Sequence, residues 1–258
     1  RAVLDTAHAE GTQAGMISHC MQVDGTLSAI TQPPVLAWAF RENLEAGGDP
    51  SVLEDVLPAL EGYLAWDLAH RDANGNGLLE WYIEGNPLCR SGESGLDNSP
   101  RFDQAAQVDA VDFSVLAAHD MGCLAKLCTR AGAPEKAALW QERSRAMSRA
   151  VHERLWDEAD GFYYDRFLDG ELTGVRAVTG FLPLLLDDLP AERVERLVAM
   201  LGSDHFATAA PIPSVATTDE AFSTDMWRGA TWVNLNFLVA LGLARYGRTE
   251  EAARLRAA

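Results

Sequence analysis

The chain has 258 residues, of which 48% are hydrophobic and 23% are charged, the composition of a globular protein with a substantial core. Its formal charge of −17 argues against nucleic acid or an anionic membrane as a partner, because both attract Lys and Arg. Four cysteines without metal-ligand spacing indicate reduced thiols, and no apolar run approaches the roughly 20 residues of a membrane span. We therefore expect a cytoplasmic protein, whose oligomeric state the sequence leaves open.

Apolar residues at helical spacing recur along the chain and predict helices separated by Gly and Pro punctuation. The predicted helices cover residues 2–13, 35–46, 52–71, 102–129, 135–156, 177–185, 191–201 and 231–246, and one more starts at Arg248. Pro58 lies inside the third of these helices, where a proline can kink the backbone. Between residues 161 and 174, alternation predicts a short β-hairpin with its turn at Asp169-Gly170.

About nine helices without alternating strands exclude a parallel α/β sheet as the architecture. No sequence repeat of fixed period is visible, which disfavours a solenoid. An irregular helical bundle or a helical toroid remains, and we expect its long loops to gather at one end.

The stretch from Gly85 to Asp103 is a polar interruption between two helix-patterned arms, and long polar loops often carry function. Two carboxylates, Glu93 and Asp97, lie in it among the helix breakers Pro87, Gly92, Gly95 and Pro100. Ser99 can cap a helix that starts at Pro100, so we expect the loop to be ordered. Its carboxylates are candidates for a general acid and its partner.

A single loop aspartate is more often a cap or a surface residue, but the glycines and the helix start beside Asp97 favour a site. A nearby helix N-terminus lowers the pKa of a carboxylic acid, whereas a general acid needs a raised pKa. Apolar walls would therefore have to desolvate Asp97. Trp227 and Trp232, with Arg228 between them, can supply flat faces and a fixed donor for a sugar ring. The alternative is that both tryptophans belong to the core.

Oxygen-bearing side chains alternate at Asp72, Asn74 and Asn76 before Gly77, as in a calcium-binding loop. The twelfth position of such a loop needs an acidic residue, and here it is Ile83. A tight Asn/Gly turn is the alternative interpretation. The sequence thus leaves open whether calcium has a structural role. We expect that catalysis by the carboxylates of the central loop requires no cofactor.

Four segments together resemble glycoside hydrolase family 63, most closely its bacterial branch of mannosylglycerate and glucosylglycerate hydrolases and related α-glucosidases. They are TQPPVLAWA, DANGNGLLEW, ESGLDNSPRFD and WRGATWVNLNFL, in the family's order and spread over most of the chain. The resemblance implies an (α/α)6 barrel, hydrolysis of an α-glycosidic bond with inversion, and Asp97 as general acid. It also implies a sugar pocket, and in some members a calcium ion at the Asp-x-Asn-x-Asn loop. The residues implied to line the pocket are Gln32, Glu93, Gly95, Trp227, Arg228 and Trp232.

Some positions depart from the family pattern. Gly92 stands where relatives usually have a Trp before the Glu of this motif, Met226 replaces an aromatic residue, and Ala230 replaces a Pro. These changes soften the pocket walls expected around a glycerate-bearing substrate. The family's general base lies in a Glu-x-Tyr-like motif beyond the second Trp of the last segment, and the chain ends before that point. Glu80, Asp225 and Glu220 are possible substitutes without a comparable motif.

We therefore expect residues 1–258 to form a single (α/α)6-barrel catalytic domain, truncated at both ends and inactive or nearly so by itself. The predicted activity of the parent protein is that of an inverting α-glycosidase acting on a small neutral or acidic sugar. Alternatives are a trehalase-like or glucoamylase-like hydrolase with the same barrel, a non-catalytic sugar-binding remnant, and a helical interaction domain. The sugar, the linkage and the aglycone stay open.

Overall fold

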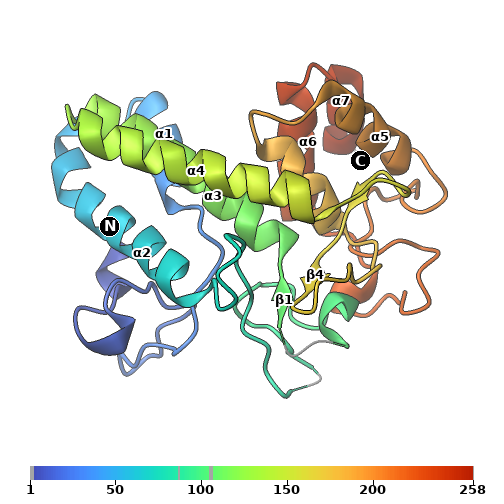
Figure 1. Ribbon diagram of the computed structural model, residues 1–258, viewed down its shortest axis with the longest axis horizontal. Helices are drawn as coiled ribbons and strands as arrows, with labels where there is room; N and C mark the ends of the chain where they lie inside the picture. Colours follow the sequence, from blue (N-terminus) through green and yellow to red (C-terminus); the bar gives the residue numbers. More distant parts are fainter. Residues whose placement is uncertain (1–2, 87, 105–106, 258) are drawn as a thin grey trace.

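The computed structural model describes residues 3–86, 88–104 and 107–257, and helices make up most of its regular structure (Figure 1). The α-helices of this part are α1 (Leu36–Glu45), α2 (Leu53–His70), α3 (Val111–Arg130), α4 (Pro134–Arg154), α5 (Ala191–Leu201), α6 (Val233–Arg245) and α7 (Thr249–Ala257). Short 3-10 helices are η1 (Leu4–Thr6), η2 (Gly11–Gln13), η3 (Pro50–Val52), η4 (Pro100–Phe102) and η6 (Met226–Arg228), and a longer one is η5 (Val178–Leu185).

An inner row of elements forms the core. Helix α1 contacts α3, α3 contacts η5, and η5 contacts α6, and both α3 and η5 are buried along most of their length. Helices α4 and α7 pack outside α3 and α6, and α4 buries only the face that carries Trp140, Met147, Ser148 and Val151. The helices therefore form two layers, inner and outer, with α3 and α4 crossing the molecule side by side (Figure 1).

The turn between α3 and α4 shows how the chain passes from the inner to the outer layer. Gly132 has φ 74°, a left-handed conformation that ends a helix easily without a Cβ atom. Pro134 occupies the first turn of α4, where its missing N–H breaks no hydrogen bond. One short turn thus reverses the chain and lays α4 against α3.

The strands are short. Strand β1 (Val108–Asp109) pairs antiparallel with β4 (Arg166–Phe167), and β2 (Trp156–Asp157) pairs antiparallel with β3 (Phe162–Tyr163). The predicted hairpin turn is confirmed: the amide of Gly170 donates to the carbonyl of Phe167 at 2.9 Å, next to an antiparallel bridge between Arg166 and Leu172. The sequence analysis missed that β4 also pairs with β1, just before α3.

Three predicted helices differ from the structure in extent or type. In place of the first predicted helix, the described part of residues 2–13 contains only the short 3-10 helices η1 and η2, while Ala2 lies outside the described residues. The helix predicted from Phe102 starts at Val111, because β1 pairs with the distant strand β4 before it. Residues 178–185 form a 3-10 helix with Pro183 inside it. The other predicted helices are confirmed, with ends that shift by a few residues.

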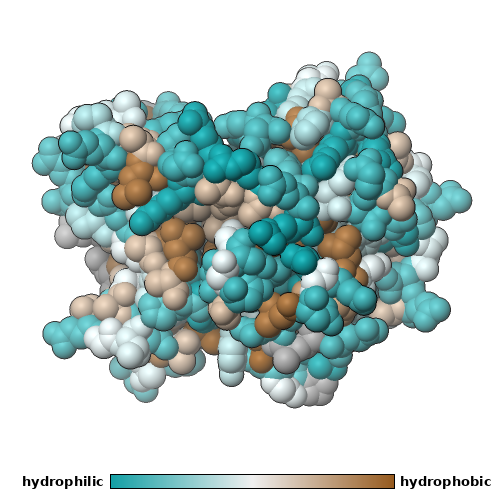
Figure 2. Space-filling view, in the orientation of Figure 1, coloured by the Kyte–Doolittle hydropathy of each residue, from teal (hydrophilic) through white to brown (hydrophobic). Residues whose placement is uncertain are grey.

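The long loop between α2 and β1 lies along the lower side of the molecule in Figure 1, together with β1 and β4. The face shown in Figure 2 is mainly hydrophilic, with small, separate hydrophobic patches. Among the described residues, no helix combines the length and the apolar character needed to cross a membrane.

Candidate active site

The central loop folds back on itself through backbone hydrogen bonds. The amides of Arg90 and Ser91 donate to the carbonyl of Asp97 at 2.8 and 3.2 Å, and the amide of Glu84 donates to the carbonyl of Arg90. The stretches around residues 84, 90 and 97 therefore lie side by side. Gly95 has φ 70° in the turn before Asp97, a conformation that explains a glycine at this position.

The helix cap expected at the end of the loop is wrong. Pro100 begins only the three-residue helix η4, and Ser99 makes no side-chain cap hydrogen bond. The long helix α3 starts at Val111, after strand β1. The sequence placed the N-terminus of a long helix directly after the loop. Because that helix does not start there, its dipole is no longer expected to lower the pKa of Asp97.

Asp97 is half-buried, and the thiol of Cys89 lies beside it. Burial, together with the nearby carboxylates of Asp97 and Glu84 that favour the neutral thiol, raises the pKa of Cys89 to about 11. Cys89 is therefore a protonated thiol at neutral pH, placed between two carboxylates.

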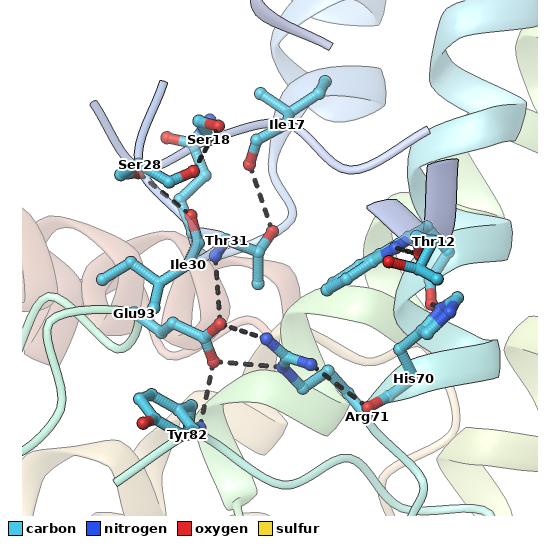
Figure 3. A network of polar contacts seen from close by, with 12 residues as sticks. Thr12, Ile17, Ser18, Ser28, Ile30, Thr31, His70, Arg71, Tyr82 and Glu93 are labelled. Atoms are coloured by element: carbon cyan, nitrogen blue, oxygen red, sulfur yellow. Dashed lines mark hydrogen bonds and ion pairs between the residues drawn. The ribbon is translucent and has the colours of Figure 1, made fainter. Parts of the chain in front are cut away.

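Glu93 is completely buried, and its carboxylate accepts hydrogen bonds from four N–H groups (Figure 3). The amides of Thr31 and Tyr82 each donate at 3.0 Å. The guanidinium of Arg71 donates twice, through Nε at 3.1 Å and through a second, shorter contact. The structure thus places Glu93 beneath the surface of the loop.

The two most specific sequence motifs meet in space. The Asn98 side chain accepts from the amide of Trp227 at 2.9 Å and donates to the carboxylate of Asp225 at 3.0 Å. Arg228 donates to the backbone carbonyl of Asn98 at 3.1 Å and to both oxygens of Asp103, at 3.1 and 2.7 Å. Residues about 130 positions apart in sequence are therefore held together directly next to Asp97.

The two tryptophans have different surroundings. Their rings stack at 3.9 Å between centroids with an interplanar angle of 11°. Trp227 is buried and packs in the core, whereas Trp232 is half-buried and donates from its indole to the carbonyl of Met226 at 3.0 Å. Met226 has φ 41°, a left-handed conformation that is strained for a residue with a side chain and occurs here at the motif itself. One face of each ring is therefore covered by the other ring.

Gln32 lies on a segment that is fixed from two sides. The hydroxyl of Tyr63 donates to the backbone carbonyl of Gln32 at 2.5 Å, and the preceding residue, Thr31, donates its amide to Glu93. Gln32 itself is half-buried. The segment therefore reaches the central loop through Glu93, which brings it close to the other motif residues.

The Asn/Gly loop is built from side-chain-to-backbone hydrogen bonds. Asp72 accepts from the amides of Asn76 and Gly77 at 2.9 and 3.0 Å, and Asn74 accepts from the amide of Asn76 at 3.0 Å. The side-chain amides of Asn74 and Asn76 both donate to the carboxylate of Asp109, at 3.0 and 2.7 Å. In the described part of the chain, no group of three or more His, Cys, Asp or Glu side chains is arranged to hold a metal ion.

Of the possible substitute bases, Glu80 belongs to this loop. It is buried and accepts from the amide of Ala73 at 2.8 Å, and burial raises its pKa to about 7, with the charges of Asp109 and Asp72 adding to the shift. Asp225 is exposed and binds Asn98. Glu220, the third possible substitute, is exposed.

Sequence reasoning missed two residues that organise the site. Asn98 lies inside the recognised motif, but nothing in the sequence indicated that it binds the second motif. Arg71, the last residue before the Asn/Gly loop, was treated only as a helix end. Its pairing with Glu93 joins residues 22 positions apart and has no local signal in the sequence.

A protein-family model described as "Mannosylglycerate hydrolase MGH1-like glycoside hydrolase domain" matches residues 1–258. The chain is 28% identical over 222 residues to an uncharacterized protein of Borreliella burgdorferi, which covers 85% of this chain and 44% of that protein. It is 27% identical over 300 residues to a mannosylglycerate hydrolase of Rubrobacter radiotolerans, with 90% and 66% covered. The chain thus spans less than two thirds of the length of these curated relatives.

Among solved structures, the chain resembles the GH63 mannosylglycerate hydrolase from Thermus thermophilus in complex with glucose. The TM-score is 0.85 at 24% sequence identity, and the match covers 99% of this chain and 76% of that chain. This likeness confirms the predicted (α/α)6-barrel fold class.

Proposed function

The chain belongs to the family of mannosylglycerate hydrolase MGH1-like glycoside hydrolases, as its resemblance to family 63 predicted, and from this premise we propose that the protein hydrolyses an α-glucosidic or α-mannosidic bond with inversion of configuration. The observation that carries the proposal is the junction of the two motifs through Asn98, which leaves Asp97 half-buried among them. The proposed substrates are small neutral or acidic sugars, because the relatives that match are mannosylglycerate hydrolases.

In this proposal Asp97 donates a proton to the glycosidic oxygen as the bond breaks. A second carboxylate, about 6.5–9.5 Å away, activates a water molecule on the opposite face of the sugar, which inverts the anomeric carbon. Trp232 offers an apolar surface for the sugar, and Gln32 offers polar contacts. Arg228 supports the pocket by fixing Asn98 and Asp103, since its donors are engaged with both.

We predict that Asp97→Asn in the full-length parent protein lowers kcat by at least about 100-fold, because proton donation by a positioned acid contributes factors of this size. Sugar binding should change little, since Asn keeps the shape of the side chain. Asp169→Asn is the matched control, because Asp169 is exposed in the hairpin turn and accepts from the amide of Glu171, and its kcat should equal that of the wild type. Turnover that survives in Asp97→Asn removes Asp97 from the mechanism.

The reaction is tested on the intact parent protein with glucosylglycerate, mannosylglycerate, trehalose, kojibiose, nigerose and maltose as substrates, with the product anomer followed by NMR. A product with inverted configuration supports the proposal. A product with retained configuration contradicts it, because retention requires a covalent intermediate and a nucleophile closer to the acid. Sugar binding without hydrolysis of any of these substrates favours a non-catalytic sugar-binding protein.

Calcium at the Asn/Gly loop is a second, separate proposal. Asp72, Asn74 and Asn76 present carboxylate and amide oxygens, the hard ligands that calcium prefers, and Glu80 Oε1 has no hydrogen-bond partner among the described residues. A calcium ion here would stiffen the loop that leads to Tyr82 and would take no part in bond cleavage. At a 100-fold excess over its Kd, calcium should stabilise the protein by about 2.7 kcal/mol. A thermal midpoint that is equal with calcium and with chelator retires the proposal.

A further inference from the structure

We propose that Glu93 is a positioning residue, which fixes the segments that carry Gln32 and Tyr82 around the Asp97 loop and does not contact the sugar. This inference rests on the proposed function of the same site. It assigns to Glu93 a role different from the substrate contact that the sequence resemblance implies. Figure 3 shows the network that carries the inference.

The carboxylate of Glu93 has no capacity left for a ligand. Oε1 accepts from the amide of Thr31 and from a terminal nitrogen of Arg71, and Oε2 accepts from the amide of Tyr82 and from Arg71 Nε. An ionised carboxylate offers about four acceptor positions, and all of them are occupied here. The side chain is also fully buried, so a sugar hydroxyl could reach it only by displacing one of these donors.

Its two backbone donors, the amides of Thr31 and Tyr82, come from two separate segments. Thr31 directly precedes Gln32, and Tyr82 directly precedes the stretch whose Glu84 binds Arg90. Tyr82 keeps half of its surface exposed although its amide is tied down. Arg90 in turn binds the backbone of Asp97. One carboxylate therefore fixes the relative positions of three stretches of chain, those that contain Thr31, Tyr82 and Asp97.

Arg71 ties this arrangement to a rigid element. It directly follows the last residue of α2, and its guanidinium lies over the ring of Trp66, 4.7 Å from the centroid. Two parallel hydrogen bonds to Glu93 fix the guanidinium in one orientation. The loop is therefore anchored to helix α2 through one ion pair, with a cation–π contact beneath it.

The test is backbone amide hydrogen exchange on the full chain, which needs no catalytic activity. In Glu93→Gln, the amides of Thr31 and Tyr82 should exchange about tenfold or more faster, as expected when hydrogen bonds to a charged group are weakened. Amides in the buried middle of α3 should change by less than about twofold, because they report global unfolding. The matched control is Asp103→Asn, a carboxylate that anchors the same loop through Arg228.

Each outcome of this experiment supports or overturns the positioning role of Glu93. Fast exchange at Thr31 and Tyr82 in Glu93→Gln, but not in Asp103→Asn, supports the positioning role. Unchanged exchange at both amides, or an equal acceleration in α3, overturns it. Loss of glucose or glycerate binding while both amides stay protected also overturns it, because that result identifies a direct ligand contact.

A second pair of variants covers the case in which Glu93→Gln does not fold. Arg71→Met removes both guanidinium donors and should accelerate exchange at Thr31 and Tyr82, whereas Arg71→Lys keeps a cation and should give an intermediate rate. Equal rates in the two variants contradict the anchoring by charge. If no glycoside is hydrolysed, the proposed function fails, and the exchange result still decides whether Glu93 holds these segments.

Discussion

At the scale of single residues, the two carboxylates of the central loop differ in what surrounds them. Glu93 is buried among four N–H donors, whereas Asp97 is half-buried beside the thiol of Cys89. A buried, fully hydrogen-bonded carboxylate is suited to holding structure, and a partly exposed one is suited to exchanging a proton with a ligand. The different surroundings of the two carboxylates follow from donors that come from elsewhere in the chain.

Glu80 gives a pH-dependent prediction. Its folded pKa of about 7 lies above its ordinary value, so between about pH 4.5 and 7 the folded state binds more protons than the unfolded state. Stability due to this group is therefore greatest at low pH and falls as pH rises through 7. Glu80→Gln removes this effect and should stabilise the protein relative to wild type by about 2 kcal/mol more at pH 8 than at pH 5.

The measurement is the midpoint of urea unfolding at pH 5 and pH 8. A chelator is present, so that no bound cation compensates the charge of the Glu80 carboxylate. Glu54→Gln, at an exposed position of α2, is the matched control and should show no such difference between the two pH values. A stability difference for Glu80→Gln that is the same at pH 5 and pH 8 contradicts the prediction.

At the scale of elements, helix α1 lacks a cap of its own and obtains one from α3. Val35 precedes α1 without a side-chain hydrogen bond. The buried Asp120 of α3 accepts instead from the amides of Ala37 and Trp38, at 3.2 and 2.7 Å. A carboxylate at this position also interacts favourably with the positive end of the helix. The start of α1, directly after the Gln32 segment, is therefore set by an inner-layer helix.

We predict that Asp120→Ala destabilises the protein by about 1–3 kcal/mol, because it leaves two amides in the first turn of α1 without an acceptor. Asp120→Asn keeps one acceptor and should destabilise the protein less. Chemical unfolding measures both effects, and Glu153→Ala, at an exposed position of α4, should stay within about 0.5 kcal/mol of wild type. If Asp120→Ala matches this control, the cap has no role in stability.

At the scale of the whole molecule, one buried arginine joins three regions. Arg101 of η4 donates to Asp112 at the start of α3, at 2.9 and 2.7 Å, and to Asp165 beside the hairpin, at 2.5 and 2.9 Å. Asp112 also accepts from the indole of Trp81 at 2.9 Å. All three charged groups are almost fully buried, and the two carboxylates hold the pKa of Arg101 above its ordinary value. The central loop, the inner layer and the hairpin thus share one ionic centre.

We predict that Arg101→Met destabilises the protein by about 3–5 kcal/mol, because it leaves two buried carboxylates without their cation. The measurement is urea unfolding followed by circular dichroism. Arg149→Met, at an exposed surface pair on α4, is the control and should change stability by less than about 0.5 kcal/mol. A loss for Arg101→Met no larger than that of the control rules out a structural role for the ionic centre.

By itself, the sequence determined the helical fold class, most helix positions and the hairpin turn, because apolar periodicity and turn residues are local signals. The family followed from the resemblance of its motifs to those of family 63. It also selected the loop and the motif residues as candidates. Only the tertiary structure decided that α3 starts at Val111, that Asn98 binds Trp227, and that Glu93 is paired with Arg71. These depend on donors and acceptors that lie 22 to 129 residues apart, and a buried polar group binds whichever partner folding brings within reach.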